Sequence, residues 1–415
     1  MSAARGGGRV TDGGTRSDTP RRELSVVLVV AVATVAIGAG SILGFLAGFV
    51  GTAIRDDLGL DRWHIGLLVS VHFGCTGLGS ITAGRITDAV GARLSVVIDL
   101  ALVMTVGVLA AVIGTYWMLI VAAVVAGFGY ALANTGTNVA VARVVSVERR
   151  TVALSIKTGG IPAMTGISAA VGPWAADAFS WQAITAALCI GAGAVGVACF
   201  FVLPDDRPMK GVTIHRRLPR GFGWFPVASF LLIAGSQPMY SWSVPYLEEE
   251  FSTSARTAGL IVAMSSFIGV GVMVLNGIRS DRVGPGRRIA VVITLCGIVG
   301  AANLLAVLGI GVGIGLAIVA IVAGIAFQLA AIGTMHAAVV DRAGPAVARA
   351  TGVTMTGYYL GALASPVAFG AFVDWTGSYT WPWFLLMIVM VFAGTAFVFA
   401  GRVEPVTGGD LRTSR

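Results

Sequence analysis

Long runs of apolar residues, separated by short charged or glycine-rich breaks, form the main pattern along this chain. A run of about 20 apolar residues is long enough to cross the hydrocarbon core of a bilayer, which is ~30 Å thick. The runs are continuously apolar and do not alternate, and backbone amides find no water partners in lipid, so helices are expected and strands are not. The pattern predicts an all-α membrane protein with twelve transmembrane helices, at 24–50, 64–84, 93–113, 116–142, 151–176, 181–203, 224–246, 257–278, 288–308, 310–339, 350–373 and 381–401.

The composition agrees with lipid as the main solvent. Hydrophobic residues make up 56% of the 415 residues and charged residues only 12%, which excludes an ordinary soluble surface. Residues 1–23 are rich in Gly, Ser, Thr and Arg and lack the apolar core of a signal peptide. We therefore expect them to form a disordered cytoplasmic tail.

The basic residues are distributed unevenly between the two sides of the predicted membrane protein. The net charge is +8, and of the 28 Lys and Arg residues only Arg55, Arg62 and Arg256 fall in loops on the side opposite the termini. Lys157 lies inside a predicted span, and the other 24 lie on the side shared by both termini. Cytoplasmic loops carry such an excess, so both termini are predicted to be cytoplasmic and the charge is assigned to topology, not to nucleic-acid binding.

A glycine–aspartate–glycine pattern occurs twice with the same spacing, 193 residues apart. Its members are Gly84, Asp88 and Gly91 in the first copy and Gly277, Asp281 and Gly284 in the second. The same offset relates Gly66 to Gly259 and Pro173 to Pro366, so one register covers nearly all of each half. The chain is therefore predicted to be two copies of one six-span unit, both in the same orientation.

Twelve spans in two parallel halves, a basic central segment at 204–223 and the repeated G-x-x-x-D-x-x-G pattern resemble the major facilitator superfamily of secondary transporters. The resemblance covers about residues 24–402. It implies two pseudo-symmetric six-helix bundles, at 24–203 and 224–402, joined by a cytoplasmic linker at 204–223 and followed by a cytoplasmic tail at 403–415. We expect a multi-pass monomer in the cell membrane, in contact with lipids and a small-molecule substrate.

In this family the aspartate of the repeated pattern is understood to hold the cytoplasmic side shut. The resemblance therefore implies a gating motif, and the alternative is a simple loop cap with arginines at lipid headgroups. A glycine at each end of the motif is expected to allow a tight reversal or a close helix approach. The members of the motif are Gly84, Asp88, Gly91, Arg93, Gly277, Asp281, Arg282 and Gly284, and Asp341 is placed to pair with the basic residues of the second copy.

A polar side chain inside a membrane span costs free energy, so each one is expected to have a structural or functional role. The family resemblance implies that the first, fourth, seventh and tenth spans line a central cavity, and the second, fifth, eighth and eleventh flank it. The substrate-cavity candidates are Tyr130, Asn134, Asn138, Lys157, Gln237, Tyr240, Gln328 and Tyr358. The alternative for the asparagines is hydrogen bonding between helices, for the aromatic residues core packing, and for Lys157 snorkelling back toward the cytoplasm.

Three ionisable groups inside spans are candidates for proton coupling. His72 and His336 have ordinary pKa values near neutrality, although a lone histidine in a bundle commonly serves packing. Asp99 is the acid clearly inside a span, where a structural partner is the alternative to proton transfer.

The sequence favours a secondary transporter that moves a small solute by alternating access, and proton-coupled uptake of an organic anion is the preferred form because Lys157 lies within a span. Efflux of amphipathic drug-like compounds and a non-transporting scaffold or sensor remain alternatives. No G-x-x-x-x-G-K-[ST] loop, H-E-x-x-H pair or G-x-S-x-G motif occurs. An enzyme, an ATP-driven pump, a cofactor and a metal site are therefore not expected.

Overall fold

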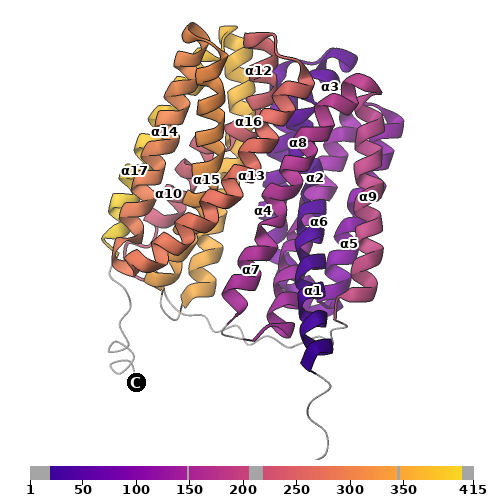
Figure 1. Ribbon diagram of the computed structural model, residues 1–415, viewed down its shortest axis with the longest axis vertical. Coiled ribbons are helices and arrows are strands. Elements are labelled where there is room, and N and C mark those ends of the chain that lie inside the picture. The colour runs from indigo at the N-terminus through magenta and orange to yellow at the C-terminus, as the bar shows by residue number, and fades with distance from the viewer. Residues whose placement is uncertain (1–18, 147–148, 205–217, 344–345, 404–415) are drawn as a thin grey trace, which may run out of the picture.

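The structure is a computed structural model that describes residues 19–146, 149–204, 218–343 and 346–403. It is all-helical in these ranges, and the helices run roughly side by side in one elongated bundle (Figure 1). The predicted tails and most of the predicted linker lie outside the described residues. The tails overlap the described residues at Thr19, where a helix already begins, and at Val403, which is buried.

In the described ranges, the first half of the chain contains nine α-helices and the second half eight, with one short 3₁₀ helix between two of the latter. The bounds are α1 Thr19–Gly40, α2 Ile42–Phe49, α3 Gly51–Leu58, α4 Arg62–Val90, α5 Ala92–Ile113, α6 Tyr116–Val144, α7 Arg150–Thr158, α8 Gly160–Ala178, α9 Trp181–Val202, α10 Trp224–Ser236, α11 Pro238–Ser241, α12 Ser243–Phe251, α13 Ala255–Val283, η1 Pro285–Arg287, α14 Arg288–Val312, α15 Ile314–Ala343, α16 Val347–Thr376 and α17 Thr380–Gly401.

Three of the predicted spans are broken and not continuous. Within the described residues, nine helices are long and apolar enough to cross a membrane alone, and α1 with α2 forms a tenth crossing that bends by 49°. The predicted span 151–176 is divided into α7 and α8 at Gly159, and the span 224–246 into α10, α11 and α12 around Pro238. Glycine is a weak helix former and proline lacks an amide donor, so both positions are suited to a break.

The charged motif is helical over most of its length. α4 continues to Val90 and α13 to Val283, and the chain reverses only at the last glycine of each copy, Gly91 with φ 92° and Gly284 with φ 83°. These two glycines adopt the left-handed region as expected. A tight reversal or a close helix approach was also expected at Gly84 and Gly277, and this expectation is wrong. Both residues are helical, and a Cβ atom on either would meet nothing within 4 Å.

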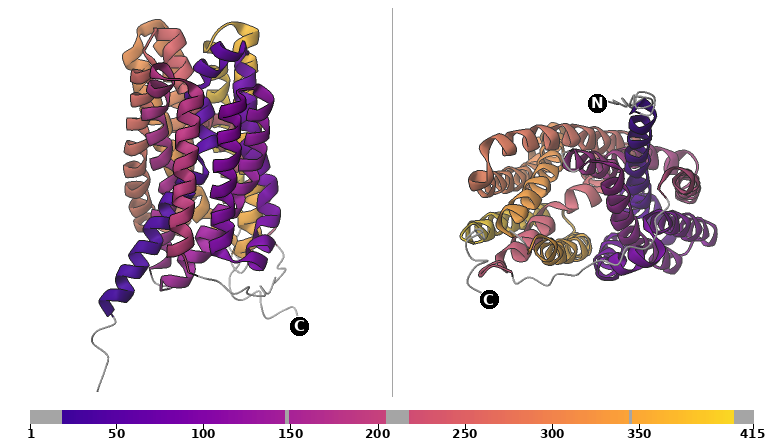
Figure 2. Two further views of the ribbon diagram at one scale, coloured as in Figure 1. Left: turned by 90° about the vertical axis from the view of Figure 1, so that its right-hand side faces the viewer. Right: turned by 90° about the horizontal axis from the view of Figure 1, so that it is seen from below.

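The nine helices α1–α9 form one half of the molecule and α10–α17 the other, side by side when viewed along the bundle (Figure 2, right). The halves meet along two helix pairs, α4 against α16 and α8 against α13. The starts of α1 and α10 and the end of α17 lie at one end of the bundle, which we call the terminus face. The other end, where α3 and α12 lie, is the distal face (Figure 1).

The two contacts between the halves are reciprocal. A Cβ atom added to Gly66 of α4 would come within 2.3 Å of the Pro366 carbonyl oxygen on α16. One added to Gly259 of α13 would come within 2.1 Å of the Ala169 carbonyl oxygen on α8 and 2.9 Å of Pro173 Cγ. Gly259 and Pro366 are the repeat partners of Gly66 and Pro173, so the interface has the pseudo-twofold symmetry that the sequence repeat predicts.

We expect Gly259→Ala to weaken closure of the distal face. The added methyl group would push α13 away from the α8 backbone, and overpacking of this kind costs roughly 1–3 kcal/mol. The change is measured as a longer distance between spin labels at the distal ends of α8 and α13. Gly271→Ala on the same helix is the matched control, since its Cβ would meet nothing within 4 Å. Equal behaviour of the two variants would contradict the prediction.

Candidate functional site

Four charged residues join the two halves at the distal face, and we call them the distal latch: Arg55, Arg62, Glu249 and Asp374. Glu249 of α12 accepts hydrogen bonds from Arg55 at 2.6 Å and from Arg62 at 2.5 and 2.9 Å. Arg62 also forms an ion pair with Asp374 of α16 at 3.3 Å. Asp374 further accepts the backbone N–H groups of Arg62 and Trp63, so it binds the N-terminus of α4 from the other half.

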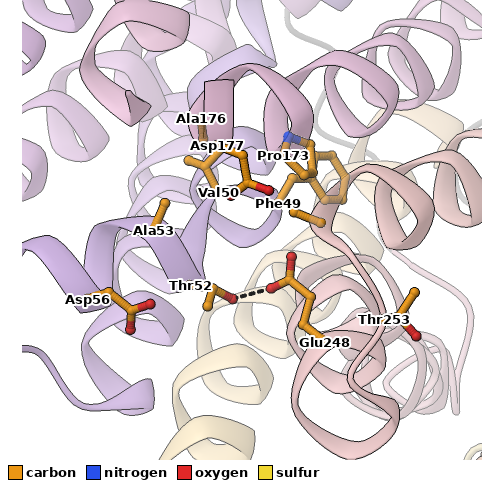
Figure 3. A pocket seen from close by; sticks show the side chains of 11 residues that line it. Phe49, Val50, Thr52, Ala53, Asp56, Pro173, Ala176, Asp177, Glu248 and Thr253 are labelled. Atoms are coloured by element: carbon orange, nitrogen blue, oxygen red, sulfur yellow. Dashed lines mark hydrogen bonds between the residues drawn. The ribbon is translucent and has the colours of Figure 1, made fainter. Parts of the chain in front are cut away.

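Beside the distal latch lies a pocket of about 220 Å³ between α3, α8 and α12, which we call the distal pocket (Figure 3). Its polar lining consists of Thr52, Asp56, Asp177, Glu248 and Thr253. Thr52 donates a hydrogen bond of 2.5 Å to Glu248, which adds a polar link between the halves. The distal pocket is therefore acidic, and one of its carboxyl groups is engaged across the interface.

Aromatic side chains from both halves meet below the distal latch. The Phe45 ring lies 5.4 Å from Phe73 and 5.7 Å from Tyr240, which belongs to the other half. Tyr358 of α16 is partly buried and lies near Tyr240, and Tyr130 of α6 lies near Tyr358. We call these five residues the aromatic layer. It brings the sequence candidates Tyr130, Tyr240 and Tyr358 together.

Lys157 is held inside the first half by the two asparagines that the sequence placed on one helix face. Its Nζ atom donates to Asn134 Oδ1 at 3.1 Å and to Asn138 Oδ1 at 2.9 Å, and the residue is only 1% exposed. The snorkelling alternative is therefore wrong, because the ammonium points to α6 and not to the surface. Asn138 is exposed and Asn134 is partly buried, so the ammonium lies beneath one amide that reaches the protein surface.

Two further ionisable groups are fully buried in the first half. Asp99 and His72 have 0% exposure, and among the described residues neither the carboxyl oxygens nor the ring nitrogens have a hydrogen-bond partner. The structural partner considered for Asp99 is thus not found within the described part of the chain. The His72 ring lies 6.0 Å from the Tyr130 ring and packs against Gly44 of α2.

The candidates in the second half are neutral and mostly buried. Gln237 and Gln328 are 3% and 2% exposed, and Gln237 Nε2, Gln328 Oε1 and the Tyr240 hydroxyl have no partner among the described residues. His336 is partly buried, with Nε2 3.3 Å from Met355 Sδ. Within its described residues, the second half therefore offers unused hydrogen-bonding groups and no buried cation comparable to Lys157.

The two copies of the charged motif differ in their contacts. In the second copy Arg288 binds Asp281 at 2.8 Å and Asp341 at 2.7 Å, which links α13, α14 and α15. The pairing expected for Asp341 is therefore found, while Arg282 is exposed. In the first copy Asp88 is exposed and shows no ion pair with a described residue. Its neighbour Arg93 lies 5.0 Å from the centre of the Phe200 ring.

The sequence reasoning missed the distal latch and the distal pocket. A signal was present in the repeat, because Arg55 and Asp56 occupy the positions of Glu248 and Glu249 in the other copy. A basic residue opposite an acidic one at equivalent positions of two halves is the arrangement that allows pairing across a pseudo-twofold axis. Asp374 carried no comparable signal.

Two like bundles that meet through reciprocal helix pairs, with polar groups buried near the interface, define a membrane transporter built from two halves. The chain belongs to the major facilitator superfamily: the model of that family, described as Major Facilitator Superfamily, matches residues 28–327 and 227–414. It is a multi-pass secondary transporter of that family and not an enzyme. No curated protein sequence matches the chain.

Solved structures with the same fold include a bacterial homolog of the human lysosomal transporter Spinster in inward-facing conformations. The unoccupied form has a TM-score of 0.74 at 13% identity, covering 92% of this chain and 98% of that chain. The occupied form has 0.71 at 14%, covering 94% and 98%. A D-xylose–proton symporter has 0.75 at 15%, covering 93% and 100%. At these identities the likeness shows the fold alone.

We expect closure of the distal face to depend on pH through Glu248. This residue lies beyond the end of its predicted span, and burial raises the pKa of its carboxyl from 4.5 to about 7. A state with an open distal face would solvate the carboxyl and restore the ordinary pKa. The closed state therefore binds more protons, so its population falls as pH rises from 4.5 to about 7 and is level above that.

The population of the closed state is measured from distances between spin labels on opposite sides of the distal face. The labels are placed in a variant that lacks the four native cysteines. Glu248→Gln should remove the pH dependence, whereas Glu250→Gln, which changes a neighbouring carboxyl outside the distal pocket, should keep it. A pH profile that is identical in wild type and Glu248→Gln would show that another group is responsible.

Proposed function

We propose that this protein takes up a small organic anion across the cell membrane, coupled to protons, by alternating access between its two halves. The observation that carries the proposal is the Lys157 ammonium, which is almost fully buried and bound by two neutral amides. A buried charge is costly unless it is paired. Among the described residues no carboxylate pairs with Lys157, so an anion from outside the chain is the missing partner.

The geometry around Lys157 is suited to a carboxylate. A lysine ammonium has three N–H donors, and two are used by Asn134 and Asn138. The third donor and the amide N–H₂ groups of the asparagines can all donate to carboxylate oxygens. Because α6 and α7 both belong to the first half, this half alone would hold the charged end of the substrate.

The topology proposed from the sequence indicates on which side of the membrane the closed distal face lies. The excess of basic residues on the terminus side supports a cytoplasmic position for both termini. The distal face, which the distal latch and the glycine contacts close, then faces the outside. We therefore interpret the structure as an inward-facing state of a monomer.

A thermal-shift screen of purified protein tests the substrate class. The probes are acetate, lactate, benzoate, succinate and citrate, with glucose and tetraphenylphosphonium as neutral and cationic comparisons. We expect stabilisation by one or more carboxylates, because a ligand that binds only the folded protein raises its unfolding temperature. Uptake of the stabilising carboxylate into proteoliposomes, with and without an imposed proton gradient, then tests transport and coupling.

Two variants locate the binding site. Lys157→Met removes the charge, and Asn138→Asp gives Lys157 a carboxylate from the chain itself. Each should weaken carboxylate binding roughly tenfold or more, since a charge-assisted hydrogen bond is worth ~1.5–3 kcal/mol. Asn303→Ala, which alters a buried amide of the second half bound to the Gly235 carbonyl, is the control and should leave affinity unchanged. Stabilisation by tetraphenylphosphonium alone would overturn the anion proposal.

Efflux of amphipathic compounds is the second candidate function. The aromatic layer favours it, because flat apolar rings from both halves can bind hydrophobic molecules without charge recognition. Binding of this kind would be independent of Lys157, so the same variants separate the two functions.

We also propose that Asp88 helps to close the terminus face in the opposite state. Its second-copy equivalent Asp281 is bound by Arg288 within its own half, whereas Asp88 is exposed, and Ser95 stands at the position equivalent to Arg288. Asp88 is therefore available for a contact that forms only after the halves rotate.

The expected result for Asp88→Asn is slower transport at an unchanged protein level, because the variant loses a charge needed in only one state. Uptake kinetics into proteoliposomes provide the measurement, and Asp281→Asn is the comparison. Asp281 is 78% exposed, so loss of its ion pair should have little effect. Wild-type kinetics in Asp88→Asn would refute the gating role.

A further inference from the structure

Asp99 is enclosed by backbone on two sides. A Cβ atom added to Gly40 of α1 would lie 2.3 Å from Asp99 Oδ2, and one added to Gly129 of α6 would lie 2.7 Å from Oδ1. Only glycine leaves room for the carboxyl at these two positions. The group is therefore sealed between α1 and α6, and it can be reached only if these helices separate.

The surroundings of Asp99 contain no described charge that would balance a carboxylate. The titratable groups that face it are the Tyr130 phenol on α6 and the Cys199 thiol on α9, which are both neutral partners. From α4, the His72 ring lies 6.0 Å from the ring of Tyr130. An ionised carboxylate without a partner is strongly disfavoured in such a site, so the neutral acid is the form that fits.

The second half shows that the fold does not require an acid at this place. The repeat partner of Asp99 is Val292, which is also fully buried in the equivalent helix α14. A valine at the same position of the same bundle supplies the packing without an unpaired polar group. The Asp99 carboxyl is therefore not needed for the packing of the bundle, and we look for its role in function.

Asp99 lies close to the Lys157 site along one helix. Its carboxyl contacts Gly129 and interacts with Tyr130, and Asn134 follows Tyr130 by four residues, about 6 Å of helix rise. Asn134 in turn binds the Lys157 ammonium. A movement of α6 that changes the anion site would therefore also change the enclosure of Asp99.

We propose that Asp99 is the proton-carrying residue of this transporter. In the conformation described here the carboxyl is protonated and sealed. When α1 and α6 separate, water enters, the proton passes from the carboxyl oxygen to water, and the carboxylate remains until it is protonated again. The proposal rests on the proposed proton-coupled uptake, and it assigns one proton per cycle to a group outside the substrate's own contacts.

Infrared difference spectroscopy tests the protonation without any substrate. Wild-type protein at neutral pH should show the C=O stretch of a buried carboxylic acid, and Asp99→Asn should lose that band. Because Glu248 is also partly protonated near neutrality, both are measured in a Glu248→Gln background. Asp177→Asn, which changes an exposed carboxylate of the same half, should keep the band. A band that survives in Asp99→Asn would overturn the proposal.

A second measurement separates a proton carrier from a packing residue. Asp99→Val copies the second half and should unfold at the same or a higher temperature. Accumulation of a binding carboxylate in proteoliposomes, driven by an imposed proton gradient, should be lost in both Asp99 variants, whereas His72→Gln should retain it. Loss of gradient-driven accumulation in His72→Gln alone would assign the proton to His72. If none of the carboxylates binds wild type, the anion proposal fails, but the infrared result still decides the state of Asp99.

Discussion

The structure depends on backbone contact between its two halves at Gly66 and Gly259. These glycines allow α4 and α13 to approach Pro366 and Ala169 in the other half far more closely than any side chain would permit. Because the contacts are related by the sequence repeat, they act as a symmetric pair of supports near one end of the molecule. Polar contacts of the distal latch then form at the same end. Two rigid bundles joined in this way can pivot while their internal packing stays intact.

Low dielectric surroundings explain where the charges of this chain are found. At the distal face the ion pairs are only partly buried, so they can form and break as the halves move. Inside the first half, Lys157 and Asp99 are buried without a counter-ion among the described residues. The free-energy cost of burying each charged side chain would fall if the side chain bound an ion of opposite charge from solution. For a cation this is an anion, and for a carboxylate it is a proton.

The sequence predicted the class of fold because hydropathy and the repeat are local or internal signals. It did not predict the helix breaks at Ser41 and Gly159, since similar residues elsewhere in the spans leave helices unbroken and packing decides between them. The positions of Asn134 and Asn138 on one face followed from helical spacing, but the turn of Lys157 toward them depends on how two helices pack. The distal latch pairs residues 194 and 312 positions apart, and a single sequence carries no direct record of such contacts.

The repeat also separates what the scaffold needs from what the function needs. The positions equivalent to Asp99 and Lys157 hold Val292 and Ala350, both fully buried, so the bundle folds with apolar side chains there. The second half instead buries Gln237 and Gln328 with polar atoms unused among the described residues. The halves thus differ in chemistry while they share a fold: one buries a lysine and an aspartate, and the other buries neutral hydrogen-bonding groups. A substrate that fits between them would have one charged end and one polar or aromatic end, and it would contact both halves at the same time.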